Sequence, residues 1–266
     1  MADIHNTLRE IEKFDKLQQR DQWVNRIHPL VKVLLTVFYI AIVVSFSKYQ
    51  LIAILSMSIY PIFMFNMGEL SFRDSLHRLR IILPIVCIVG IFNPFFDREV
   101  ITMVGQLPIT GGVLSMLTLM VKVVLTVLAA YLLIATTGIE DICYALRMVH
   151  IPKILVTIML LIYRYIYILL EEAGRIVTAY KLRAPKQKGI AYQAWGSLIG
   201  QLLLRSMDRA EHVYESMCLR GFRGDFIGVS KKRIRGSDLL FLMSWVAVIL
   251  VLRYTAFIEW VGGLFT

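Results

Sequence analysis

The chain has 266 residues, of which 58% are hydrophobic and 18% are charged, and its formal net charge is +10. Ordinary soluble domains are only about 45–50% apolar, so this composition and a mean hydropathy of +0.67 favour a polytopic membrane protein. Three cysteines and five histidines are scattered along the sequence, which excludes a disulfide framework and predicts no metal or cofactor site within this chain.

The first 28 residues carry basic and acidic side chains before any long apolar stretch, so they do not form a secretory signal peptide. Ile4, Leu8, Ile11 and Phe14 recur at helical spacing. Segment 1–28 is therefore predicted to be cytoplasmic or interfacial, either as an amphipathic helix on the membrane surface or as an ordinary solvated lead-in.

Four apolar runs have the length or near-length of a membrane span, for which a helix needs about 20 residues. They cover residues 29–46, 51–66, 81–96 and 113–135. A fifth run begins at Leu239 and continues to Val251 or beyond. These runs predict an all-α polytopic membrane protein, with four transmembrane helices in residues 29–135 and a fifth, followed by a tail, in residues 239–266.

A sixth apolar run, residues 154–170, precedes the most basic part of the chain. Residues 171–236 hold 13 basic and six acidic side chains, a net charge of +7, and basic loops mark the cytoplasmic side. If the run crossed the membrane, that charge would lie outside and Arg164 would cost about 2.5–3.5 kcal/mol in the hydrocarbon. The run is therefore predicted to lie along or dip into the cytoplasmic face without spanning. The N-terminus and residues 136–238 are then cytoplasmic, and the C-terminus is outside.

Two long helices are predicted within residues 136–238. The first follows Pro152 and runs from about residue 154 to residue 183, where Pro185 stops it. The second runs from about residue 191 to residue 220 and stops at Gly221.

The second predicted helix has an apolar stripe and a pair of small residues. The stripe consists of Trp195, Leu198, Leu202, Ala210, Val213 and Met217. Gly196 and Gly200 form a small-x-x-x-small pair, which either marks contact with a crossing helix or occurs by chance.

Both predicted helices end in the same way, on Leu182-Arg183-Ala184 and on Leu219-Arg220-Gly221. Capping explains either ending alone, because arginine in a last turn contributes about 0.3–1 kcal/mol through the helix dipole and glycine is a common cap. Capping does not require leucine before the arginine and a small residue after it each time. The recurrence therefore predicts two docking tips, since arginine carries a rigid fork of donors and a small neighbour lets a tip enter a groove.

Three stretches, in this order, carry a family resemblance. They are NRIHPLVKVLLTVFYIAIVVSFSKY (residues 25–49), IMLLIYRYIYILLEEAGRIVTAYKLRA (158–184) and YESMCLRGFRGDF (214–226). Over essentially its whole length the chain resembles the transmembrane T component of energy-coupling factor (ECF) transporters, and more narrowly the cobalt-uptake, CbiQ-like branch.

The resemblance implies a scaffold in a bacterial or archaeal cytoplasmic membrane that joins a substrate-binding membrane subunit to two ABC-type ATPases. In this family, two Ala-Arg-Gly-like motifs at the ends of cytoplasmic coupling helices each seat in a groove of one ATPase. They carry over to Leu182-Arg183-Ala184, where alanine replaces the glycine and Pro185 follows, and to Leu219-Arg220-Gly221. Residues 136–238 would then be the coupling-helix section.

The implied function is to pass ATP-driven motion to the substrate-binding subunit. Cobalt (Co²⁺) follows from the closest resemblance, while nickel or a vitamin stays open because another subunit selects the substrate. The chain contains no Walker-type phosphate-binding motif, so it is predicted not to be an enzyme, and ATP and Mg are expected in the partner ATPases.

The main alternative is a self-contained secondary transporter. Such proteins place acids or histidines in the membrane, whereas the first four runs contain no Asp, Glu or His. Lys122 is the only charge deep in one of them. It is expected to pair with a partner subunit, to snorkel to the interface, or to lie near the end of a slightly shifted span.

An enzyme site or a nucleic-acid surface fits the residues less well. Glu171 and Glu172 are expected to face solvent beside Arg175, and no nucleophile stands at a catalytic spacing from a base. The apolar stripe favours protein partners over nucleic acid for the basic section. Four of residues 231–235 are basic, and the stretch is expected to form a positive anchor against the lipid bilayer.

Overall fold

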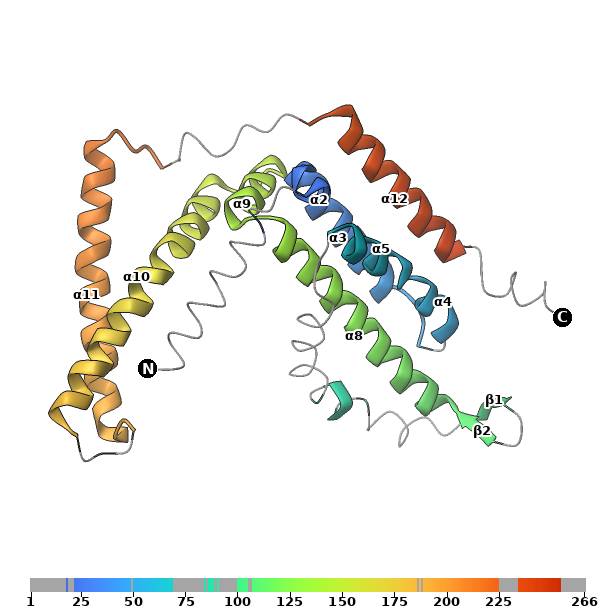
Figure 1. The fold of residues 1–266 in the computed structure, drawn as a ribbon, viewed down its shortest axis with the longest axis horizontal. Helices are drawn as coiled ribbons and strands as arrows, with labels where there is room; N and C mark the ends of the chain where they lie inside the picture. Colours follow the sequence, from blue (N-terminus) through green and yellow to red (C-terminus); the bar gives the residue numbers. More distant parts are fainter. Residues whose placement is uncertain are drawn as a thin grey trace. The chain divides into compact units, whose positions relative to one another are not determined.

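The computed structural model describes residues 18, 22–48, 50–68, 84, 86–88, 90, 100–104, 107–185, 187, 189–224 and 234–254. The chain divides into two compact units (Figure 1). Unit 1 comprises Met1–Leu17 and Gly138–Lys231, and unit 2 comprises Gln18–Thr137 and Lys232–Thr266.

Unit 2 is a bundle of apolar helices. Its elements are α2 (Trp23–Arg26), α3 (Pro29–Val44), α4 (Leu51–Ser56), α5 (Ile59–Met67), β1 (Val100–Val104), β2 (Leu107–Thr110), α8 (Gly111–Thr136) and α12 (Gly236–Tyr254). The helices α3, α4 and α5 all pack against α8, and α12 packs against α3 and α4 (Figure 1). The long helix α8 is therefore the element that most of this bundle shares.

Unit 1 contains α9 (Ile139–Met148), α10 (Lys153–Arg183) and α11 (Tyr192–Leu219). The short helix α9 packs against α10, and α10 packs against α11. A left-handed residue, His150 with φ 68°, ends α9. The amide of Ile151 then bonds back to Leu146 O at 3.3 Å before α10 begins.

The predicted all-α polytopic fold class is confirmed, with one small addition. The strands β1 and β2 form an antiparallel hairpin in which Val104 lies opposite Leu107. Among the described residues, three helices are long and apolar enough to cross a membrane, namely Gly111–Thr136, Lys153–Arg183 and Gly236–Tyr254. Shorter apolar helices cover Pro29–Val44 and Leu51–Met67.

The predicted spans have different outcomes. Those at 29–46, 113–135 and 239–251 correspond to α3, α8 and α12. The span at 81–96 and segment 1–28 lie largely outside the described residues. Because α10 also has a span-like length and composition, its predicted non-spanning position, like the predicted domain limits, stays a prediction.

The second predicted span is not one continuous helix but two, α4 and α5. Pro61 has no amide hydrogen, so it leaves the carbonyl of Met57 without its usual helical donor. The buried hydroxyl of Tyr39 donates to that carbonyl at 3.0 Å. Ser58 adds to the break, because its hydroxyl bonds back to Leu55 O. The proline was visible in the sequence, but the tyrosine that makes the break stable was not.

Two lysine side chains link α3 to α8, one at each end of this helix pair, and we call them the lysine clamps. Lys32, in the first turns of α3, is buried, and its ammonium donates to Thr136 O at the end of α8 over 2.7 Å. Lys122 of α8 donates to Val44 O at 3.1 Å and to Phe46 O at 2.5 Å, at the end of α3. A helix leaves its last carbonyls without partners and carries negative charge there, so each lysine stabilises the end of the neighbouring helix.

Lys122 finds two of its acceptors within this chain, at the end of α3. Pairing with a partner subunit, snorkelling and a slightly shifted span stay predictions for it. Arg253 of α12 reaches the same helix end, where its guanidinium bonds to Ser45 Oγ at 3.0 Å and lies 5.6 Å from the Phe46 ring centroid. Cations from α8 and α12 thus converge on residues 44–46.

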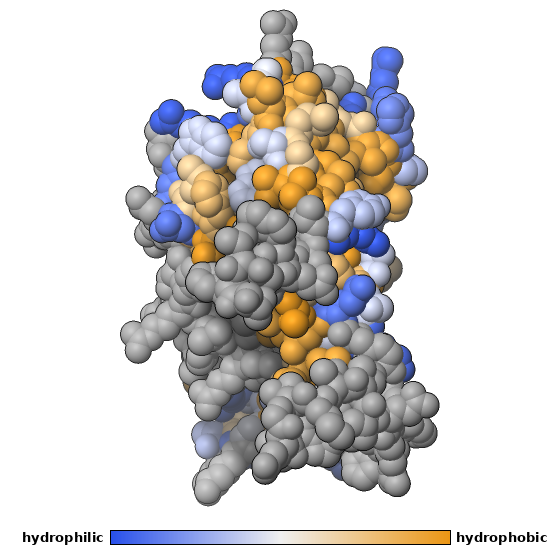
Figure 2. All heavy atoms as spheres, turned by 90° about the vertical axis from the view of Figure 1, so that its right-hand side faces the viewer, coloured by the Kyte–Doolittle hydropathy of each residue, from blue (hydrophilic) through white to orange (hydrophobic). Residues whose placement is uncertain are grey.

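Apolar side chains remain exposed on the outside of unit 2, as expected for helices that contact lipid. Figure 2 shows hydrophobic residues over much of the described part of one face, with hydrophilic residues at its edges. On α12, Leu240 is 73% exposed and Met243 is 62% exposed, whereas Trp245 and Ile249 on its other side are buried. Burial on one side and apolar exposure on the other fit the multi-pass fold.

Replacing the lysine clamps is expected to destabilise unit 2. Lys32→Met leaves the Thr136 carbonyl without its donor in a buried place, at a cost of about 1–3 kcal/mol, and Lys122→Met has the same kind of effect at the end of α3. Thermal unfolding of the purified chain in detergent measures the loss. The exposed Lys181→Met is the control and should change the midpoint little. An equal midpoint in all three variants would contradict the clamp.

Candidate docking ends of two long helices

The helices α10 and α11 are long and sparsely covered. None of the residues of α11 is buried, and in α10 only Val156, Thr157 and Ile176 are. Their bounds match the predicted helices at 154–183 and 191–220 to within one residue. At 1.5 Å per residue, α11 is about 42 Å long. Among the described residues, both helices thus keep many exposed side chains.

The end of α11 is closed by main-chain hydrogen bonds that require Gly221. Arg220 is the C-cap residue, and Gly221 follows with a left-handed φ of 79°. The amide of Phe222 donates to Met217 O at 2.9 Å, and that of Gly221 donates to Cys218 O at 2.9 Å. This pair of bonds is the Schellman motif. A side chain at position 221 would be strained at that φ, so glycine is required by the backbone.

The end of α10 is closed differently, which explains its alanine. Ala184 is the C-cap residue with a φ of −127°, and its amide donates to Tyr180 O. That φ lies in the range that a residue preceding proline adopts, as Ala184 does before Pro185. No left-handed residue is needed at this place, so a glycine is not required there.

The loop between the helices is tied to α10. The hydroxyl of Tyr180 donates to Gln187 Oε1 at 2.6 Å and accepts from the amide of Ala191 at 3.2 Å. Ala191 is the N-cap residue of α11. A single side chain in the last turn of α10 therefore holds the start of α11 in place.

The two Leu-Arg endings are exposed and lie at opposite ends of α11, because α10 ends where α11 begins (Figure 1). Leu182 is 77% exposed and Leu219 is 89% exposed, and both Arg183 and Arg220 are exposed. Within the described part of the chain, neither arginine side chain makes a hydrogen bond or an ion pair. Main-chain groups cap both helices, so the two guanidinium groups are not used as caps.

The glycine pair of α11 touches no other described element. A methyl group built on Gly196 or Gly200 meets no described atom within 4 Å apart from the neighbouring backbone of α11 itself. The idea that a helix crosses here therefore needs a partner and stays a prediction.

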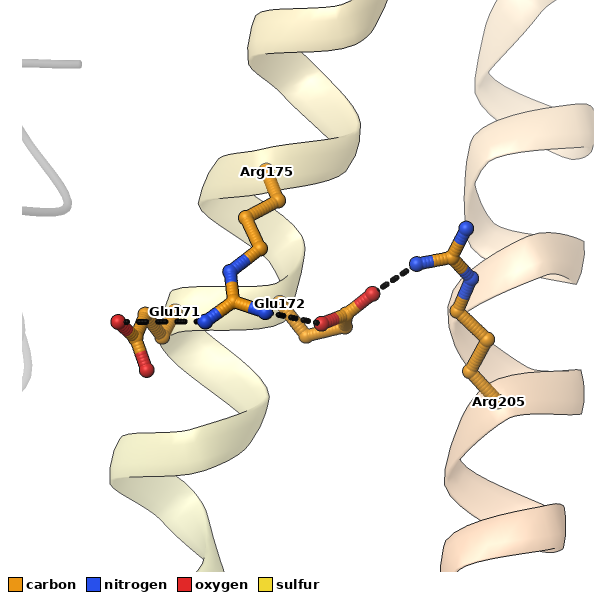
Figure 3. Close-up of polar contacts among 4 residues, drawn as sticks. All are labelled: Glu171, Glu172, Arg175 and Arg205. Atoms are coloured by element: carbon orange, nitrogen blue, oxygen red, sulfur yellow. Dashed lines mark hydrogen bonds and ion pairs between the residues drawn. The ribbon is translucent and has the colours of Figure 1, made fainter.

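A cluster of four charged residues joins α10 to α11 (Figure 3). Arg175 lies 3.5 Å from Glu171 and 3.7 Å from Glu172, measured from guanidinium nitrogen to carboxylate oxygen. Glu172 also accepts a hydrogen bond from Arg205 of α11. The expectation that both acids face solvent was correct for Glu171, whose side chain is 65% exposed, but wrong for Glu172, which is 18% exposed. Its partner stands 33 positions away, so no local pattern indicates it.

Beside this cluster, α10 and α11 enclose a groove of about 870 Å³. Leu161 and Tyr165 line it from α10, Asp208, Arg209 and His212 line it from α11, and Arg220 lines it just beyond the end of α11. The described residues contain no group of three or more His, Cys, Asp or Glu side chains that could hold a metal ion.

The described helices define a multi-pass membrane protein, and two of its long helices, α10 and α11, end on exposed Leu-Arg pairs. The sequence pattern of the family CbiQ, described as a cobalt transport protein, matches residues 20–234. The chain belongs to this family. It is thus a T component of the ECF transporter class, in the cobalt and nickel branch. The family consists of transporter membrane components and is not a family of catalysts.

Three relatives illustrate the similarity. The energy-coupling factor transporter transmembrane protein EcfT of Listeria innocua is 27% identical over 81% of this chain and 85% of its own length. The nickel permease LarQ of Lactiplantibacillus plantarum is 27% identical over 42% of this chain and 41% of its own. The cobalt transport protein CbiQ of Rhodobacter capsulatus is 33% identical over 35% of this chain and 38% of its own.

The two helix ends predict different responses to exchanging alanine and glycine. Gly221→Ala places a side chain in the left-handed region, which costs about 1–2 kcal/mol, and should fray the last turn of α11. Hydrogen exchange measured by mass spectrometry should then be faster for the amides of Gly221 and Phe222. Ala184→Gly is the matched control and should leave exchange at the end of α11 unchanged. Unaltered exchange in Gly221→Ala would refute the assigned cap.

Proposed function

We propose that this chain is the energy-coupling subunit of an ABC-type importer and that it carries motion from two ATPases to a substrate-binding membrane subunit. The observation that carries the proposal is the pair of exposed Leu-Arg endings whose arginines are left free by main-chain caps. Membership of the CbiQ family supports it.

The chemistry of each ending suits insertion into a groove. An exposed leucine supplies apolar area, and the arginine beside it supplies several donors for carboxylates or carbonyl groups. Arg183 and Arg220 lie at opposite ends of α11, so each is available to a different ATPase. The residues carried over as docking motifs are Leu182-Arg183-Ala184 and Leu219-Arg220-Gly221.

In the proposed cycle, ATP binds and is hydrolysed in the partner ATPases, which supply the Mg sites. Closure of the two ATPases shifts the grooves relative to one another. Because α10 and α11 are continuous helices, a displacement at either tip is passed along about 40 Å of helix. The uncovered apolar side chains of these helices, such as Ile162 and Leu203, are the surface on which the substrate-binding subunit would respond.

Cobalt is the proposed substrate, because the matched family is described as a cobalt transport protein. Nickel is the second candidate, and the nickel permease among the relatives supports it. A vitamin is the third candidate. Uptake assays with radioactive Co²⁺ and Ni²⁺ in cells that express the complete complex distinguish the metals.

Reversing the charge of both tips is expected to abolish coupling. In Arg183→Glu/Arg220→Glu, the carboxylates repel the acidic or carbonyl lining of a groove, so the ATPases should no longer co-purify and uptake should fall to background. The chain itself should remain in the membrane. Co-purification with tagged ATPase subunits and metal uptake are the measurements.

The matched control is Lys181→Glu/Arg223→Glu. It makes the same change of charge beside the same two tips but leaves the motifs intact, so co-purification and uptake should persist. If the control lost binding as fully as the tip variant, net charge and not the motifs would be responsible. If the tip variant kept both activities, the proposed function would be rejected.

Native cysteines test the proposed cytoplasmic side of α11. Cys218 is exposed two residues before Arg220, whereas Cys143 is buried, and this burial raises the pKa of the Cys143 thiol, with nearby Glu140 adding to the effect. A membrane-impermeant maleimide should label Cys218 in inside-out vesicles but not in intact cells, and should leave Cys143 unlabelled in both. Bound ATPases should protect Cys218. Labelling of Cys218 in intact cells would reverse the proposed orientation.

A further inference from the structure

The position of α11 beside α10 is not set by a packed core. No residue of α11 is buried, and grooves of about 870 Å³ and 450 Å³ open along the two helices. Side chains from the apolar half of α10, including Leu161 and Tyr165, face both grooves, as do Val213 and Met217 of α11. Few apolar contacts therefore resist a change in how far the two helices spread.

Two polar ties hold the helices together at different distances from their loop. The first is Tyr180, which fixes the start of α11 at the loop itself. The second is the bond from Arg205 to Glu172. Glu172 lies about 16 Å before the end of α10, at 1.5 Å per residue, so this bond bridges the helices well above the loop.

The end of α11 that carries Arg220 lies beyond the second tie. From Arg205 to Arg220 the helix rises about 22 Å. A small change of angle at Arg205 is therefore enlarged at Arg220. The larger groove lies between this part of α11 and residues 161–172 of α10. The two helices therefore have room to move closer together as well as apart.

We propose that Glu172 and Arg205 are a positioning pair that sets the spread between α10 and α11, and with it the place of Arg220 relative to the apolar half of α10. The effect of the pair on transport rests on the proposed function. The effect of the pair on the spread between the two helices does not rest on the proposed function, because both residues belong to this chain.

The charges around the pair suit a contact that opens and closes. Arg175 lies 3.7 Å from Glu172 and 3.5 Å from Glu171, so Glu172 retains a cationic neighbour on its own helix when Arg205 leaves. Arg205 is 58% exposed and can be solvated at once. When the ion pair opens, Glu172 keeps the cation of Arg175 nearby and Arg205 is solvated, so opening costs little free energy. Motion of a docked partner is therefore enough to break the pair.

Distance measurements on the full-length chain in lipid nanodiscs test the spread. Spin labels are placed on native Cys218 and on Leu155→Cys of α10, in a background that carries Cys87→Ala and Cys143→Ala. Glu172→Arg should lengthen or broaden the distance distribution, because it sets an arginine against Arg205. The exchange Glu172→Arg/Arg205→Glu should restore the original distribution.

Glu171→Gln is the matched control. It lies one residue away and loses one carboxylate, but Glu171 pairs only within α10 in the described contacts (Figure 3). Its distance distribution should equal that of the parent. If Glu172→Arg also equals the parent, or if the exchange variant fails to restore the distribution, the positioning pair is refuted.

The role in transport is measured as metal uptake per ATP hydrolysed in the complete complex. Glu172→Arg and Arg205→Glu should each lower this ratio by about two- to fivefold, the range that a partly exposed ion pair supports, while the ATPases still co-purify. The exchange variant should recover it. An unchanged ratio in the single variants would refute this role.

Failure of the proposed function would look different. In that case the parent chain would not bind the ATPases, whereas the spread would still respond to Glu172→Arg.

Discussion

Unpartnered carbonyl groups at the ends of helices are the constraint on which this structure depends. A helix leaves its last four carbonyls without intrahelical donors, and an apolar environment offers no water to satisfy them. In unit 2, lysine side chains of neighbouring helices donate to these carbonyls in both directions. Lys32 of α3 donates to the end of α8, and Lys122 of α8 donates to the end of α3. This exchange fixes the two helices side by side, and α4, α5 and α12 pack around them.

The same constraint is met in another way in unit 1, with consequences for function. The ends of α10 and α11 are closed by main-chain amides, so Arg183 and Arg220 are not needed as caps. Cations that would cost free energy in an apolar bundle are instead exposed at helix ends, each beside an exposed leucine. The exposed Leu-Arg endings are thus a product of how these helices end. The way α10 ends also explains why alanine is tolerated at position 184, because the φ of that residue does not require glycine.

Hydrophobic periodicity and helix breakers were enough to predict most of the helices and the ends of α10 and α11. The limits of α10 and α11 follow from Pro152, Pro185 and Gly221, which act on the backbone next to them. Polar contacts were much less predictable. Thr136 lies 104 positions from Lys32, and Phe46 lies 76 positions from Lys122. Glu172 was expected to face solvent because its neighbour Arg175 was visible in the sequence and its partner Arg205 was not.

By itself the sequence determined the helical class, the places where the long helices end, and the repeated Leu-Arg endings, because these depend on residues within a few positions of one another. Only the tertiary structure decided what the charged residues within the helices do. Lys32 and Lys122 each donate to the end of the neighbouring helix. Tyr39 donates to the carbonyl that Pro61 leaves without its helical donor, and Glu172 links α10 to α11. Each of these roles needs a donor and an acceptor that are distant in sequence, and folding alone brings such groups together.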